Sequence, residues 1–144
     1  MPLFNIDKIV RLVSEMRKAV SYLTSLQSVG KDAFLHDPDK VGSAKYHFIV
    51  AIESAIDICN HIISQNGYRA PEDYADTFQV LAEQGAFDMS FTASLKEMAK
   101  FRNRLTHLYW EVDDEQVYEI LLSRLNDFKK FLDSIAAFLG LEKL

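Results

Sequence analysis

The sequence predicts an all-α fold, an antiparallel up-and-down bundle of four to five helices. Apolar residues recur every three to four positions along most of the chain, the spacing of a helix face that packs against neighbours. Glycine and proline stand between these segments, where helices usually end or begin. Only Leu105 to Val112 has a composition that suits an extended segment. The short connections favour antiparallel neighbours.

The first two helical segments are defined by their apolar spacing and by the glycines that follow them. Apolar residues from Ile6 to Leu26 predict a long amphipathic helix that stops near Gly30. A short turn of helix is expected around residues 33–36. Pro38 then marks a break, because proline restricts the residue before it but is tolerated in a first helical turn. A second long helix is predicted from Lys40 to Ser64.

Three further helices are predicted in the second half of the chain. A short helix is expected from Tyr74 to Gln84, since a proline and two acidic residues precede it and Gly85 follows. Another is expected from Ser90 to Arg104. The last is predicted to run as one helix from Asp113 or Asp114 to Gly140, with an apolar stripe wide enough to touch two neighbours or a second subunit.

Bulk properties favour one cytoplasmic domain covering residues 1–144. A chain of 144 residues with 49% hydrophobic content can bury a core without disulfides or metals. The single cysteine, Cys59, has no partner in the chain, which favours a reducing compartment and a buried role. No run of 18 apolar residues and no signal peptide is visible, so no membrane segment is expected. The net charge of -5 argues against broad coating of nucleic acid but leaves room for a small site.

Most familiar catalytic motifs are absent. There is no glycine-rich phosphate loop, no nucleophile elbow, and no cluster of cysteine or histidine at metal-binding spacing, so neither a metal nor a cofactor is expected. Three dispersed histidines, His36, His47 and His61, are interpreted as surface or packing residues.

The segment from Arg102 to Tyr109 is the candidate site. It overlaps a basic cluster and precedes an acidic run that begins at Glu111; the cluster consists of Lys96, Lys100, Arg102 and Arg104. The unperturbed pKa of histidine, about 6.5, suits His107 to proton transfer near neutral pH. The planar guanidinium of Arg102 suits phosphate oxygens. Together these two side chains suggest cleavage of a phosphodiester without a metal.

Helix geometry restricts how Arg102 and His107 could cooperate. Five positions on an unbroken helix leave the two side chains ~140° apart around the axis. Either the helix breaks between them, or the site is completed across a dimer. Tyr109 would share the face of Arg102 only if the helix continued that far.

The run Arg102-Asn103-x-x-x-His107-x-Tyr109 is similar to the signature of HepT-like toxins of the HEPN superfamily. The resemblance covers about Ile6 to Leu139. Besides the motif, it is carried by the segments 51–63, 110–113 and 117–120.

This resemblance implies a HEPN-like helical homodimer that cuts RNA as a metal-independent endoribonuclease, with Arg102 and His107 as catalytic residues and Asn103 supporting the histidine or the substrate. It also implies a type VII-like toxin–antitoxin pair. The partner would be a minimal nucleotidyltransferase antitoxin, which attaches AMP to Tyr109. A bulky anionic adduct beside the catalytic pair would repel RNA.

Two other functions remain open at this stage. One is a non-catalytic, nucleotide-binding or substrate-presenting partner of a minimal nucleotidyltransferase, which would form a tight complex and show no nuclease activity. The other is a plain helical interaction module. In that case Arg102 and Arg104 are solvated residues at a helix end, His107 packs between helices, and Arg102 and His107 can be exchanged without a phenotype.

Overall fold

A computed structural model describes residues 1–144, and every regular element in it is a helix. The elements in chain order are α1 (Ile6–Gln27), α2 (Lys31–Leu35), α3 (Pro38–Asn66), α4 (Tyr74–Glu83), α5 (Met89–His107), the short 3-10 helix η1 (Tyr109–Glu111), α6 (Asp114–Ser123) and α7 (Asn126–Leu139). The predicted all-α bundle is confirmed. The structure has seven α-helices, which exceeds the four to five expected.

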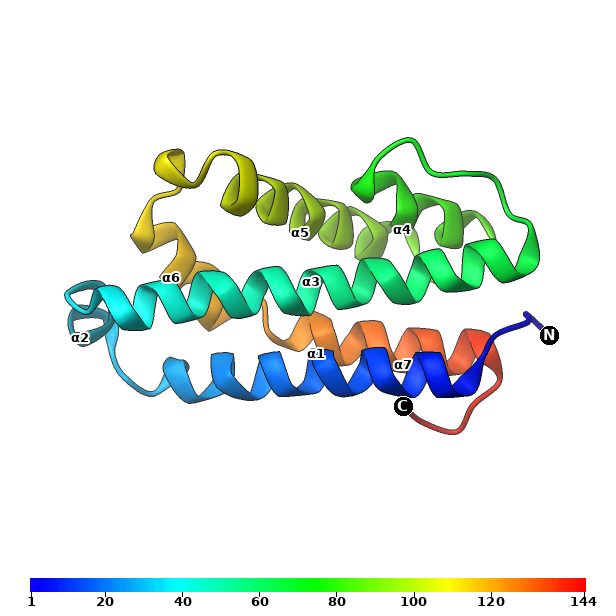
Figure 1. The fold of residues 1–144 in the computed structure, drawn as a ribbon, viewed down its shortest axis with the longest axis horizontal. Coiled ribbons are helices and arrows are strands. Elements are labelled where there is room, and N and C mark those ends of the chain that lie inside the picture. Colours follow the sequence, from blue (N-terminus) through cyan, green and yellow to red (C-terminus); the bar gives the residue numbers. More distant parts are fainter.

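The longest helix, α3, runs through the whole length of the bundle (Figure 1). In this view α1 and α7 are seen below α3, and α4 and α5 are seen above it. By length and composition α3 could span a membrane, but 61% of its most apolar window is buried inside the protein. Its apolar character is therefore explained by its central place in the core.

Acidic or amide side chains cap five of the seven α-helices at their N-termini. Asp37 accepts hydrogen bonds from the N–H groups of Asp39 and Lys40, with Pro38 in the first turn of α3. Asn5, Asp73, Asp88 and Asp113 cap α1, α4, α5 and α6 in the same way. Each such cap stabilises a helix end by about 0.5–2 kcal/mol.

The predicted single helix from Asp113 or Asp114 to Gly140 is wrong, because it is divided at Arg124 and Leu125 into α6 and α7. Neither glycine nor proline marks the division. The Arg124 guanidinium instead bonds Glu97 of α5 at 2.7 Å and lies 3.5 Å from Asp127 at the start of α7. Tertiary contacts therefore redirect the chain at a point where local helix propensity is unbroken.

One hydrophobic core joins the helices, and aromatic rings fill its centre. Phe131 of α7 is fully buried. Its ring centroid lies 6.1 Å from that of Phe78 in α4 and 5.7 Å from that of Phe87. Cys59 of α3 is also fully buried, and burial raises the pKa of its thiol well above the usual value. The ring contacts of Phe131 join α7 to α4 and to the connection between α4 and α5.

Replacing Phe131 with alanine is expected to destabilise the protein by about 3–5 kcal/mol, because a fully buried ring is lost and a cavity remains. Chemical denaturation followed by circular dichroism measures the change. Phe138, a partly buried phenylalanine of the same helix, is the matched control and should cost clearly less as Phe138→Ala. Equal losses of unfolding free energy in both variants would contradict the central position of Phe131 in the core.

Candidate functional site

Helix α5 carries both Arg102 and His107 without interruption. Asp88 caps its start, accepting a hydrogen bond from the N–H of Phe91 at 2.7 Å. The helix ends at His107, and Leu108 closes it by donating its N–H to the carbonyl oxygen of Arg104. Of the two alternatives considered, a helix break between Arg102 and His107 is thus wrong, since the break follows His107. Within this chain the two side chains therefore lie ~140° apart around the helix axis.

The Arg102 guanidinium is held on three sides. Its Nε and Nη2 atoms donate to Oε1 of Glu53 in α3 at 3.0 and 2.5 Å. Its Nη1 donates to Oδ1 of Asn103 at 3.1 Å, and its central carbon lies 4.8 Å from the centroid of the Tyr74 ring. The Arg102 side chain is only 12% exposed. Three of the five N–H groups of an arginine are engaged, which leaves two for a ligand.

An acidic pair on α3 lies next to this guanidinium. Glu53 and Asp57 are four residues apart and so share one face of the helix. Partial burial raises the pKa of the Asp57 carboxyl, and the charge of Glu53 raises it further, whereas Lys8 and Arg102 lower it. An anionic ligand of Arg102 must therefore approach from the side away from these two carboxylates.

His107 lies at the exposed C-terminal end of α5, and the short helix η1 follows it directly. Tyr109 and Trp110 belong to η1 and are 63% and 66% exposed. Tyr109 is therefore not on the continued face of α5 that would align it with Arg102. It is presented separately, on an exposed turn beside the histidine.

Asn103 lies against Arg102 and accepts a hydrogen bond from its guanidinium. Arg104, in contrast, points to another side of α5, where it bonds the Gln116 side chain of α6. The two arginines of the basic cluster thus differ: Arg102 belongs to the candidate site, and Arg104 connects α5 to α6.

Sequence reasoning missed Glu53 and Tyr74 as parts of the site. Glu53 is 49 residues from Arg102 in the chain, so no local motif connects them. The one available signal is that Glu53 and Asp57 interrupt the apolar run of α3 on a single face. Tyr74, as the first residue of a short helix, carries no comparable signal.

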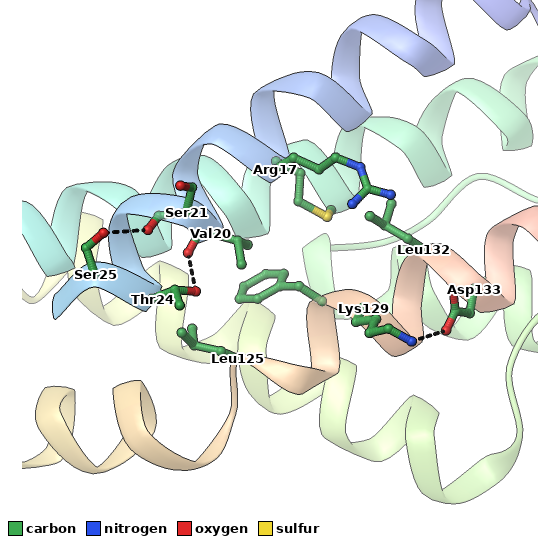
Figure 2. A pocket seen from close by; sticks show the side chains of 11 residues that line it. Arg17, Val20, Ser21, Thr24, Ser25, Leu125, Lys129, Leu132 and Asp133 are labelled. Atoms are coloured by element: carbon green, nitrogen blue, oxygen red, sulfur yellow. Dashed lines mark hydrogen bonds and ion pairs between the residues drawn. The ribbon is translucent and has the colours of Figure 1, made fainter. Parts of the chain in front are cut away.

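A groove also lies away from this site, between α1 and α7 (Figure 2). Its volume is about 570 Å³. Its hydroxyl groups bond their own helix, as Thr24 does to the Val20 carbonyl oxygen, and Lys129 pairs with Asp133 at 3.3 Å. Few polar groups therefore converge on a ligand there. No group of three metal-ligating side chains is assembled anywhere in the structure.

A helical bundle with an arginine and a histidine five positions apart, followed by a tyrosine, defines a domain of the HEPN type. The family model of ribonuclease HepT-like proteins matches residues 9–135. The chain therefore belongs to the ribonuclease HepT-like family.

Individual relatives agree with this assignment. The mRNA nuclease HepT of Shewanella oneidensis is 27% identical over 131 residues, which cover 91% of this chain and 98% of that protein. A solved structure of the tri-AMPylated HEPN toxin of Shewanella oneidensis in complex with an MNT antitoxin superimposes with a TM-score of 0.84 at 26% identity, covering 91% of this chain and 98% of that one. The structure of the Bacillus subtilis protein YutE, a cytosolic protein of unknown function, has a TM-score of 0.81 and 18% sequence identity to this chain. The match covers 97% of this chain and 94% of YutE, and it shows that the two share the fold.

Proposed function

We propose that this protein is the ribonuclease toxin of a type VII-like toxin–antitoxin pair, an endoribonuclease that works in the cytoplasm as a homodimer and needs no metal. The observation that carries the proposal is the held guanidinium of Arg102, with two N–H groups free, on the same helix as the exposed imidazole of His107. Family membership and the nuclease and toxin names of the relatives support it.

The chemistry follows from the two side chains. The imidazole of His107 takes the proton of a ribose 2′-hydroxyl, and that oxygen forms a bond to phosphorus. The bond from phosphorus to the 5′-oxygen breaks, and the leaving oxygen takes up a proton from a water molecule or from a protonated His107 imidazole. The products are a 2′,3′-cyclic phosphate and a 5′-hydroxyl end. The guanidinium of Arg102 stabilises the negative charge that develops on the phosphate oxygens.

Within one subunit Arg102 and His107 point to different sides of α5, so a second subunit is needed to bring an arginine and a histidine together. In this proposal, Arg102 and His107 of both subunits line one shared cleft, so that the imidazole of one protomer acts beside the guanidinium of its partner. Asn103 and Glu53 then hold the arginine, and the histidine remains free to move its proton. A variant that is monomeric but folded should therefore lose cleavage.

The reaction is tested with purified protein and two RNA oligonucleotides of the same sequence, one unmodified and one with 2′-O-methyl groups. We expect cleavage of the unmodified strand alone, undiminished by EDTA, with cyclic phosphate ends seen by mass spectrometry. Cleavage that EDTA abolishes, or equal cleavage of both strands, would contradict this mechanism. A tight complex with a nucleotidyltransferase and no cleavage would favour the non-catalytic partner.

Silencing by the antitoxin is proposed to act at Tyr109. The hydroxyl of this 63% exposed tyrosine attacks the α-phosphorus of ATP, pyrophosphate leaves, and the hydroxyl proton passes to solvent or a base. The attached phosphate carries negative charge next to His107, which excludes the RNA backbone.

The Tyr109→Phe variant is expected to remain a nuclease but to escape neutralisation, because the attacking oxygen is gone. Growth of a host that expresses the cognate nucleotidyltransferase together with each toxin variant measures this. The wild type should be neutralised and Tyr109→Phe should arrest growth. Tyr46→Phe, at another exposed tyrosine, is the control and should be neutralised like the wild type. Full neutralisation of Tyr109→Phe would refute the modification site.

A further inference from the structure

The only tryptophan of the chain, Trp110, is displayed at the edge of the candidate site. It lies three residues after His107 and is 66% exposed. Its only ring partner is Tyr109, with centroids 5.2 Å apart and planes at 80°. Because this arrangement is perpendicular, at least one face of the indole has no ring against it. A large apolar ring left open in this way is suited to a planar ligand.

The turn that carries Trp110 is well fixed. Leu108 donates its N–H to the carbonyl oxygen of Arg104 at 2.9 Å, and Glu111 donates to the carbonyl oxygen of Leu108 at 2.8 Å. Val112, directly after η1, is buried in the core and anchors the turn. Little backbone entropy therefore remains to be lost when a ligand contacts the indole.

Charge on either side of Trp110 limits what the ligand can be. The last turn of α5 before it carries His107, whereas Arg104 of the same turn bonds Gln116 on another side of the helix. Four acidic residues follow it within five positions: Glu111, Asp113, Asp114 and Glu115. Of these, Asp114 is paired with Lys45 at 3.0 Å. A phosphate backbone is repelled by the acidic side, whereas an uncharged base is free to lie over the indole.

We propose that the indole of Trp110 stacks on an unpaired nucleobase of the RNA substrate, close to the bond that is cut. This inference rests on the proposed function and makes single-stranded RNA the substrate class, since bases within a duplex have no free face. Stacking on an aromatic ring tolerates every base, so Trp110 contributes affinity and placement and does not read sequence.

Intrinsic fluorescence tests this directly, because Trp110 is the only indole in the chain. The His107→Ala protein is titrated with a single-stranded RNA oligonucleotide and, separately, with the same strand in a duplex. We expect saturable quenching by the single strand and little by the duplex. Unchanged fluorescence at RNA concentrations that saturate binding by anisotropy would overturn the inference.

Kinetics supply the second measurement. Trp110→Ala should raise KM about 10- to 100-fold with kcat nearly unchanged, and Trp110→Phe should restore most of the affinity, because one stacked base contributes a factor of this size. Leu122→Ala, at an exposed apolar residue of α6, is the control and should leave KM unchanged. A Trp110→Ala protein that keeps the wild-type KM, or that loses its dimer by size exclusion with KM restored at high protein concentration, would overturn the inference in favour of a protein interface.

The two proposals fail separately. Saturable quenching by single-stranded RNA with no cleavage by the wild type would refute the nuclease and keep the base-binding surface. Cleavage by the wild type, with neither quenching nor a KM change, would refute the base-binding surface alone.

Discussion

Replacement of His107 by alanine is expected to lower RNA cleavage by about 10² to 10⁴-fold, the usual contribution of a general acid or base. His107 is exposed at the end of α5, so its removal leaves no cavity and no unpaired buried group. The effect should therefore fall on kcat, while the melting temperature and RNA affinity stay close to those of the wild type. Rates of oligonucleotide cleavage, measured beside thermal unfolding, separate these quantities.

Growth of a bacterial host provides an independent readout of the same variant. Induction of the wild-type chain should arrest growth and deplete RNA, and induction of His107→Ala at an equal level should not. His36→Ala is the matched control, because His36 is also exposed at a helix end. Full activity in His107→Ala, or an equal loss in His36→Ala, would remove His107 from the mechanism. Unaffected growth with all soluble variants would favour the non-catalytic partner.

Much of the fold could be predicted because its signals are local. The end of α3 at Gly67 is an example: this glycine takes φ 64°, a conformation that other residues adopt at a cost. The same helix begins at Pro38, two residues before the predicted start at Lys40, because Asp37 caps it and proline is tolerated in a first helical turn. Signals of this kind depend on neighbours in the chain and need no knowledge of the fold.

The division between α6 and α7 could not be predicted, because it depends on contacts between distant segments. Arg124 has ordinary helix propensity, and its ion pair with Glu97 exists only after α5 and α6 have met. The extension of α5 to His107, three residues beyond the predicted end at Arg104, has a similar basis. The β-branched and aromatic residues after Arg104 argued for an early stop, but Leu105 is buried and holds this turn against the core.

The candidate site likewise has one part that the sequence predicted and one part that depends on the fold. Arg102, Asn103, His107 and Tyr109 lie in one short motif, so their grouping was visible in the sequence. The groups that hold Arg102 come from α3 and α4, and only the fold brings them to it. A sequence motif can predict which side chains are reactive. Their orientation and electrostatic surroundings depend on the folded structure.

Removal of Arg102 is expected to lower cleavage by about 10² to 10³-fold, because its charge is needed where the transition state develops charge on oxygen. Arg102→Lys should recover little of this loss, since an ammonium cannot bond Glu53 and a phosphate through a planar fork. Arg104→Ala is the control, because that arginine bonds Gln116 and points away from the site. A comparable loss in Arg104→Ala would mean that general basic charge, and not Arg102 itself, supports the reaction.

Glu53 should matter only through Arg102, and a double mutant cycle can show this. Glu53→Ala alone is expected to lower kcat about 10-fold, since the guanidinium loses the carboxylate that holds two of its N–H groups. In the Arg102→Ala background the same change should have almost no further effect, because nothing remains to be oriented. Asp57→Asn, on the same face of α3, controls for the loss of negative charge near the site. A full additional loss in the double variant would give Glu53 a direct part in proton transfer, and higher activity in Glu53→Ala would mean that the carboxylate competes with RNA for the arginine.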